Sequence, residues 1–135
     1  MYAASIATDN NNHLFYWLFE KPQEMPTLVP LVMIMNGGPG FSSLNSLFTE
    51  TGPLRVSQKD PMNQDSYEIS YVPAQSWQSL GDLLYVEHPV GTGWSSPSDL
   101  SEMALEFLQF LNNFYKEFPE RKKQELVLTG EGYAG

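Results

Sequence analysis

Residues 126–135 read Leu-Val-Leu-Thr-Gly-Glu-Gly-Tyr-Ala-Gly. The apolar run Leu126-Val127-Leu128 predicts a strand, and this strand leads directly into a turn that contains three glycines in six residues. The chemistry that the chain can perform depends on what this turn carries.

Two known motifs fit the turn, and they predict different chemistry. The pattern G-x-G-x-x-G after a strand is the fingerprint of dinucleotide binding, which also needs a helix and an acidic residue about 20 positions further on. The chain up to Gly135 offers neither, so a nucleotide-binding module is the weaker expectation. The second motif is a nucleophile elbow, a strained strand-to-helix turn that lifts one side chain above the end of a sheet. In that interpretation Gly132 occupies the middle position, which is normally a serine.

The composition indicates one globular domain and excludes several classes of partner. The 135 residues are 41% hydrophobic and 17% charged, which is a length and composition typical of a single folded unit. With 16 acidic and 7 basic residues the net charge is −9, so binding to nucleic acid or to an anionic membrane is not expected. Without cysteine, and with only two isolated histidines, the chain offers no ligand spacing for a metal, and we expect no cofactor.

The sequence contains no recognisable targeting or membrane segment. No apolar run approaches the roughly 18 residues of a membrane span, and the N-terminus lacks the basic and apolar regions of a signal peptide. We therefore expect no membrane span and a chain that stays in the cytosol.

The first half of the chain reads as strands around one glycine-rich loop. Residues 2–8 and 13–19 predict an antiparallel hairpin. The continuous apolar run Leu31–Met35 predicts a central parallel strand that is buried on both faces. Three glycines and a proline follow within Asn36–Gly40, so the backbone must turn sharply there, before a short helix from Ser43 to Glu50.

The second half predicts a strand, a helix and another strand. Two further strands at residues 53–57 and 67–72 precede a second buried strand, Leu83–Val86. A helix follows, with Asp99 as N-cap, Glu102 as its capping-box partner, and an apolar stripe formed by Met103, Phe107, Phe110, Leu111 and Phe114. The mixed charges of residues 116–125 predict a solvated connection to the strand that begins at Leu126. A strand-helix-strand unit of this kind predicts an α/β fold with a parallel sheet and a crossover helix.

Five blocks of sequence carry a family resemblance. They are Asn36-Gly37-Gly38-Pro39-Gly40-Phe41-Ser42-Ser43-Leu44, Glu50-Thr51-Gly52-Pro53, Pro89-Val90-Gly91-Thr92-Gly93-Trp94-Ser95, Phe118-Pro119-Glu120 and Gly130-Glu131-Gly132-Tyr133-Ala134-Gly135. In order and spacing these blocks resemble the serine carboxypeptidase family, the carboxypeptidase Y and cathepsin A group of α/β-hydrolases. The resemblance implies that residues 1–135 form the N-terminal part of such a catalytic domain, with an N-terminal hairpin, a mostly parallel central sheet and a crossover helix, ending at the elbow.

The resemblance also implies roles for particular residues. Acyl transfer needs an activated hydroxyl, a base and donors for the oxyanion, and the family's oxyanion donors correspond to the backbone N–H groups of Gly38 and Tyr133. The network that holds the terminal carboxylate of a peptide corresponds to Asn36, Glu50 and Glu131. Carboxylic acids in such a network must be partly protonated to donate to another carboxylate, which is why these enzymes favour acidic pH.

The sequence departs from the family at the positions that perform the chemistry. Gly132 stands where the family has its nucleophilic serine, and glycine has no atom that could attack a carbonyl. The two histidines, His13 and His88, precede the elbow, whereas the family's triad follows the order Ser, Asp, His; we expect them to be a hairpin surface residue and a loop-packing residue. Phe41 replaces a disulfide cysteine, and Ile34 replaces a tryptophan of the carboxylate pocket.

These observations leave three functional hypotheses. The first is a catalytically inactive serine carboxypeptidase-like protein that acts as a structural or binding subunit, with a peptide C-terminus as its ligand if binding is retained. The second is part of an active serine-type carboxypeptidase that removes C-terminal residues, and the third is the nucleotide-binding module. Because half a hydrolase sheet would expose a strand edge, we expect a protein partner or second chain to cover it. Family members are usually secretory, vacuolar or lysosomal, in contrast to the cytosolic location expected above.

Overall fold

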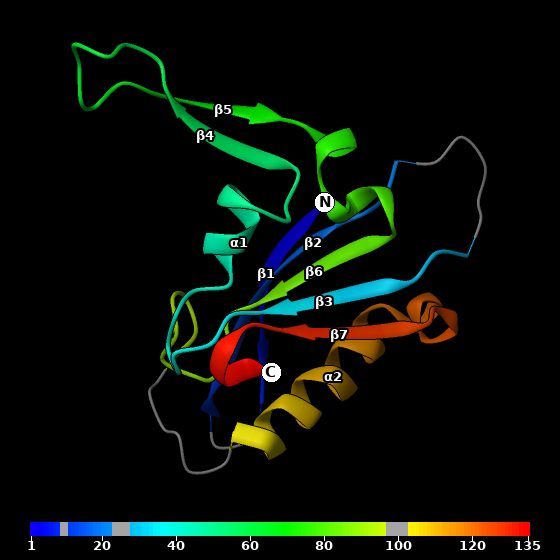
Figure 1. Ribbon diagram of the computed structural model, residues 1–135. Helices are drawn as coiled ribbons and strands as arrows, with labels where there is room; N and C mark the ends of the chain where they lie inside the picture. Colours follow the sequence, from blue (N-terminus) through cyan, green and yellow to red (C-terminus); the bar gives the residue numbers. More distant parts are fainter. Residues whose placement is uncertain (9–10, 23–27, 97–102) are drawn as a thin grey trace.

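The computed structural model describes residues 1–8, 11–22, 28–96 and 103–135 (Figure 1). Its main sheet has five strands in the order β1-β2-β6-β3-β7. Their bounds are β1 Tyr2–Ala7, β2 His13–Phe19, β3 Leu31–Met35, β6 Asp82–Val86 and β7 Leu126–Gly130. The predicted hairpin is present as β1 and β2, and β2 also pairs antiparallel with β6. The three strands β6, β3 and β7 are parallel, so the sheet is mixed, with the predicted parallel part at its centre and one edge.

Strand β3 is buried on both faces because a helix covers each side of the sheet. Leu31 and Met33 belong to one hydrophobic cluster together with residues of α2 (Met103–Glu117). Val32 and Ile34 belong to a second cluster, which includes Leu47 of α1 (Leu44–Thr49). Alternate side chains of a strand point to opposite faces, so a strand between two helices must be apolar at every position. This arrangement explains the continuous apolar run of the sequence.

Helix α2 packs through its aromatic stripe. Phe110 and Phe114 are fully buried, and the ring of Phe114 meets that of Tyr16 in β2 edge-on at 5.6 Å between centroids. The stripe therefore serves core packing. The predicted N-cap residues Asp99 and Glu102 lie outside the described residues. None of the helices in the described part of the chain has the length and apolarity needed to cross a bilayer. Short 3-10 helices occupy Pro73–Gln75, Trp77–Ser79, Pro119–Lys123 and Gly132–Ala134.

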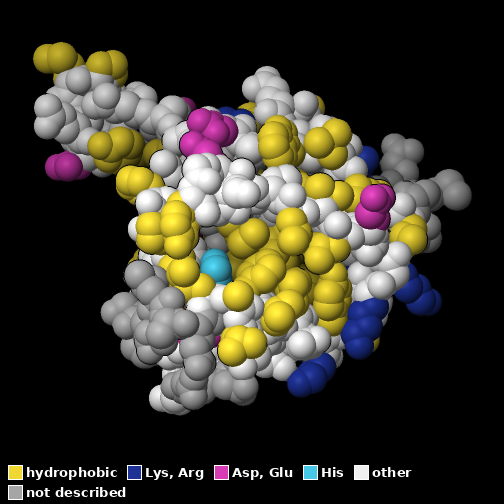
Figure 2. All heavy atoms as spheres, turned by 60° about the horizontal axis from the view of Figure 1, so that its bottom comes forward, with side chains coloured by type: hydrophobic (Ala, Val, Ile, Leu, Met, Phe, Trp, Pro, Cys, Tyr) yellow, Lys and Arg dark blue, Asp and Glu magenta, His cyan; other side chains and the backbone are white. Residues whose placement is uncertain are grey.

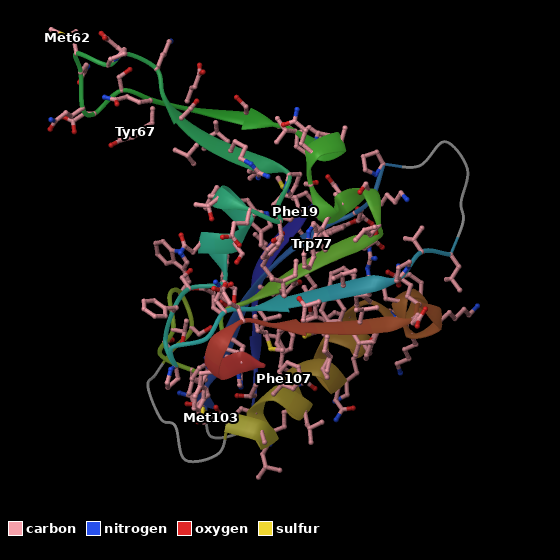
Figure 3. All side chains as sticks on the ribbon, viewed as in Figure 1. Phe19, Met62, Tyr67, Trp77, Met103 and Phe107 are labelled. Atoms are coloured by element: carbon pink, nitrogen blue, oxygen red, sulfur yellow. The ribbon has the colours of Figure 1, made fainter. Side chains whose placement is uncertain are left out.

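The strands β4 (Leu54–Gln58) and β5 (Tyr67–Tyr71) form a separate two-stranded sheet. Figures 1 and 3 show that this ribbon projects away from the main sheet, with Met62 at its tip and Tyr67 farther along it. Val56 faces Ile69 across the ribbon, and both side chains are exposed. The sequence predicted the two strands correctly, but it gave no indication that they leave the main sheet.

One arginine of the charged run 116–125 is buried, contrary to the prediction of a fully solvated connection. The side chain of Arg121 is enclosed beside the start of β6, where Nη1 lies 2.6 Å from Asp82 Oδ2 and Nη2 lies 2.7 Å from Glu20 Oε1. Asp82 Oδ2 also accepts a hydrogen bond from Gln124 Nε2 at 2.7 Å. A buried carboxylate needs such partners, so this arginine ties the connection to the amino end of the sheet.

We expect Arg121→Met to lower the free energy of unfolding by about 3–5 kcal/mol, because it leaves the Asp82 carboxylate buried without its cation. Urea denaturation measures this loss. Lys122→Met, which alters an exposed neighbour, should change stability by less than about 0.5 kcal/mol. Adding Asp82→Asn to Arg121→Met should recover part of the loss, and strict additivity of the two substitutions would contradict the pairing.

Candidate functional site

The site lies at the carboxyl ends of the parallel strands. Strand β3 leads into residues 36–41, here called the glycine loop, and β7 leads into residues 130–135, here called the terminal turn. The two strands are paired from Leu31 and Leu126 to Met35 and Gly130, so both segments emerge at the same edge of the sheet. The chain segments after β3 and β6 leave toward opposite faces, where α1 and α2 lie, and such a divergence creates a crevice in α/β sheets.

The glycine loop and the terminal turn touch through their backbones. A Cβ atom added at Gly37 would overlap the carbonyl oxygen of Glu131 and would lie 2.5 Å from the nitrogen of Tyr133. The glycine loop is itself closed by a hydrogen bond from Phe41 N to Gly37 O at 2.9 Å. Only glycine permits this approach, which brings the neighbouring Gly38 next to the turn.

Gly132 has the left-handed backbone conformation, with φ of +61°. A Cβ atom built at this position meets no atom within 4 Å, so a side chain here would project into open space. A residue held at positive φ after a strand matches the strained turn expected of a nucleophile elbow. The terminal turn therefore has the backbone of an elbow and no side chain to present.

Asn36 and Glu131, two of the three residues predicted to bind a carboxylate, are joined directly. Asn36 Nδ2 donates to Glu131 Oε2 at 3.3 Å, and Ser46 Oγ donates to Asn36 Oδ1 at 2.9 Å. The backbone N–H of Asn36 donates to Ser43 Oγ at 3.1 Å. The buried Asn36 is thus held on three sides, and the exposed carboxyl group of Glu131 is left with capacity for a ligand.

Glu50, the third predicted residue, lines the same cavity. This cavity has a volume of about 440 Å³ and lies between α1, the glycine loop and the terminal turn. The structure brings all six predicted site residues to it: Asn36, Gly38, Glu50, Glu131, Gly132 and Tyr133. Asn45, Ser46 and Thr49 of α1 complete a wall that is mostly polar.

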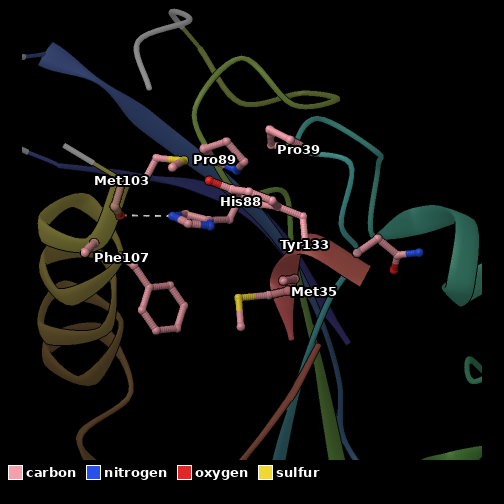
Figure 4. Close-up of a pocket in the computed structure, with 10 residues that line it drawn as sticks. Met35, Pro39, His88, Pro89, Met103, Phe107 and Tyr133 are labelled. Carbon is pink, nitrogen blue, oxygen red and sulfur yellow. Dashed lines mark hydrogen bonds between the residues drawn. The ribbon is translucent and has the colours of Figure 1, made fainter. Parts of the chain in front are cut away.

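A second, mainly apolar cavity of about 280 Å³ lies on the α2 side of the terminal turn. Figure 4 shows His88, Met103, Phe107 and Tyr133 around it. His88 Nε2 donates to the carbonyl oxygen of Met103 at 3.0 Å, and its ring packs against Phe107. These contacts agree with the predicted loop-packing role of His88. His13 lies at the start of β2 and is half-buried.

Two residues that the motifs did not single out support the site. Ser46 orients Asn36, and Glu87, the residue after β6, accepts a hydrogen bond from Ser42, the residue that follows the glycine loop. The end of α1 is fixed by Thr51 Oγ1, which lies 2.9 Å from the hydroxyl of Tyr85. Burial raises the pKa of Tyr85, so this hydroxyl stays protonated throughout the physiological pH range. Among the described residues, no three histidine or acidic side chains gather as a metal site would need.

Gly37→Ala should separate the glycine loop from the terminal turn, because the new methyl group would overlap backbone atoms that have no alternative position. We expect a loss of about 2–3 kcal/mol in the free energy of unfolding, measured by urea denaturation. Gly132→Ala is the matched control: it adds a methyl group in open space, and its cost of about 1 kcal/mol comes from the positive φ alone. Equal stability of the two variants would contradict the close approach at Gly37.

The fold and the site define a class of protein. The crystal structure of Kex1(Δ)p, a prohormone-processing carboxypeptidase from Saccharomyces cerevisiae, superimposes with a TM-score of 0.81 and 29% sequence identity. The match covers 98% of this chain and 31% of that structure. The chain therefore has the fold of the N-terminal part of an α/β-hydrolase.

The sequence comparison identifies the family. A sequence profile described as serine carboxypeptidase matches residues 2–135, and the chain belongs to this family. The pheromone-processing carboxypeptidase KEX1 of Ogataea parapolymorpha is 39% identical over 96% of this chain. Carboxypeptidase Y homolog A of Ajellomyces dermatitidis is 36% identical over 94% of it. Each match covers 22% of the relative, so the chain spans about a fifth of the length of these proteins.

Proposed function

We propose that this chain is a catalytically inactive member of the serine carboxypeptidase family that binds the C-terminus of a peptide. The observation that carries the proposal is Gly132 at the tip of an elbow-shaped turn, directly beside a polar cavity that contains Asn36, Glu50 and Glu131. The site combines the residues that would hold a terminal carboxylate with the absence of the residue that would attack the peptide.

Covalent catalysis requires a side chain at position 132. The turn would project a serine hydroxyl into the space between the glycine loop and α1, but hydrogen alone stands there. The backbone N–H groups of Gly38 and Tyr133 could still stabilise an oxyanion. Such groups without a nucleophile leave roughly 10³-fold acceleration over water at most.

Carboxylate binding does not depend on position 132. Asn36 is fixed by hydrogen bonds with Ser43 and Ser46, and neither of these contacts involves the terminal turn. The carboxyl groups of Glu50 and Glu131 are exposed to the cavity, where a protonated carboxyl can donate to the carboxylate of a ligand. The cavity is thus equipped to bind a peptide C-terminus without cleaving it.

The full-length protein should fail to react with a fluorophosphonate probe, because no activated hydroxyl stands at the elbow. It should also release no C-terminal amino acid from a blocked dipeptide above the rate of a heat-denatured sample. An active serine carboxypeptidase treated in parallel supplies the positive control. Labelling of the protein, or amino acid release above the denatured control, would refute the proposed inactivity.

Glu131→Gln should strengthen peptide binding by about tenfold, because the neutral amide beside Asn36 donates to the carboxylate of a ligand and carries no negative charge to repel it. Fluorescence anisotropy with a labelled peptide measures this change.

Glu125→Gln removes an exposed acid on the connection before β7 and should leave the peptide affinity unchanged. A peptide with an amidated C-terminus should bind weakly at every pH. Equal affinity for the free and amidated peptides would rule out carboxylate recognition.

The alternative, part of an active carboxypeptidase, is supported by the space at position 132. Since a Cβ atom there meets nothing within 4 Å, the elbow could accept a serine without rearrangement. Probe labelling of a Gly132→Ser variant would show that a base acts on this position and would favour the alternative. Absence of labelling in the Gly132→Ser variant would indicate that the protein also lacks the base that activates the serine, and it would agree with the proposed inactivity.

We also propose that further polypeptide covers the surface between α2 and β7. Figure 2 shows hydrophobic side chains gathered over a hollow on this side of the molecule. Leu128 of β7 is exposed there, and the outer edge of β7 pairs with no strand in the described part of the chain. An exposed parallel edge beside apolar surface is unfavourable in water. Identification of the polypeptides that copurify with the protein tests whether a second chain supplies this cover.

A further inference from the structure

Glu87 is a fully buried acid at the edge of the sheet where the candidate site lies, with an exposed fraction of 0%. It follows β6 directly, and its backbone is fixed on both sides: its N–H donates to Phe15 O at 2.9 Å, and its carbonyl accepts from Ser95 Oγ at 2.6 Å. Its side chain therefore extends from an anchored position. Neither the carboxylate network nor the candidate oxyanion donors include this residue.

The carboxylate of Glu87 binds the segment that follows the glycine loop. Its Oε1 accepts a hydrogen bond from Ser42 Oγ at 2.8 Å and a longer one from Leu44 N at 3.4 Å. Ser43, the residue after Ser42, donates from Oγ to the carbonyl oxygen of Val86 at 2.6 Å. Two consecutive residues at the end of β6 thus hold two consecutive serines after the glycine loop.

The other carboxylate oxygen, Oε2, is packed against the loop that follows β6. A Cβ atom at Gly93 would overlap it, and Oε2 has no hydrogen-bond partner in the described part of the chain. Burial of a carboxyl oxygen without a hydrogen-bond partner is costly. The hydrogen bonds that Oε1 accepts from Ser42 and Leu44 offset this cost. Glu87 is consequently packed between residues 91–95 and the segment that follows the glycine loop, and it cannot move without moving one of them.

We propose that Glu87 is a positioning residue that holds the glycine loop against the terminal turn. The loop is fixed at one end by β3 and at the other by Ser42 and Ser43, so the place of Gly38 between these ends depends on the Glu87 contact. Through Gly37, which touches the terminal turn, the same contact sets the spacing between the N–H groups of Gly38 and Tyr133. Its consequence for ligand binding rests on the proposed function, whereas its effect on the loop does not.

Substitutions in the full-length protein separate positioning from general stability. Glu87→Met keeps the length of the side chain and removes the acceptor, while Glu87→Gln keeps one acceptor oxygen for Ser42. Glu106→Met is the matched control, because Glu106 is also buried, is bonded through one oxygen to Asn12, and has a second oxygen without a partner in the described residues. Glu106 lies in α2, outside both cavities.

Amide hydrogen exchange of residues 37–44 in the ligand-free protein tests the proposal without any assumption about function. We expect exchange in this segment to rise about tenfold or more in Glu87→Met, to return toward the original rate in Glu87→Gln, and to stay unchanged in Glu106→Met. Ser42→Ala, which removes the donor, should raise exchange in the same segment and should add little to Glu87→Met in the double variant. Equal exchange of residues 37–44 in Glu87→Met and Glu106→Met would overturn the proposal.

Peptide affinity supplies the functional measurement. The dissociation constant should rise about tenfold or more in Glu87→Met, with recovery in Glu87→Gln. A change in loop exchange with no change in affinity would overturn the functional part of the proposal and leave the structural part standing. If the unmodified protein binds no peptide, the proposed function fails, and the exchange measurement still decides the role of Glu87.

Discussion

The backbone contact between Gly37 and the terminal turn is the constraint on which the site depends. It joins the segments that follow two neighbouring parallel strands, which are separated by about 90 residues in the chain, and it leaves no room for a side chain at Gly37. Three groups of the candidate site adjoin this contact. Asn36 and Gly38 are the neighbours of Gly37 in the chain, and the carbonyl oxygen of Glu131 is one of the atoms that Gly37 approaches.

The contact forms because β3 and β7 are adjacent and parallel. A parallel pair places both carboxyl ends at one edge, so the segments that follow β3 and β7 begin side by side, whereas the segment after β6 leads to α2 on the opposite face from α1. Strand β3 can occupy the centre only because each of its side chains is apolar, since α1 covers one face and α2 the other. The packing of the core therefore determines where the polar residues of the site meet.

Much of this arrangement could be predicted from the sequence. The apolar runs of β3, β6 and β7, the stripe of α2, and the blocks at Asn36 and Gly130 are local signals, and the structure contains each element. Other features depend on contacts between distant segments. The sequence predicts strands at β4 and β5 but does not specify their sheet, and the charged run around Arg121 gave no sign of its buried pairing with Asp82. Likewise, no motif points to Ser46 or Glu87, whose partners lie far away or on another element.

The proposed function requires a carboxylate-binding site whose contacts do not depend on position 132. No atom packs where a Cβ at position 132 would stand, so the loss of a serine leaves no cavity in a packed interior and breaks no supporting contact. The groups that hold Asn36 belong to α1 and to the segment before it, and Glu131 is aligned by the pairing of its N–H with Met35 O at 3.2 Å. Glycine also accepts the φ of +61° without the strain that a serine would bear there. In the proposed function, glycine at position 132 abolishes catalysis at the elbow and relieves its backbone, while the contacts that hold Asn36 and Glu131 remain.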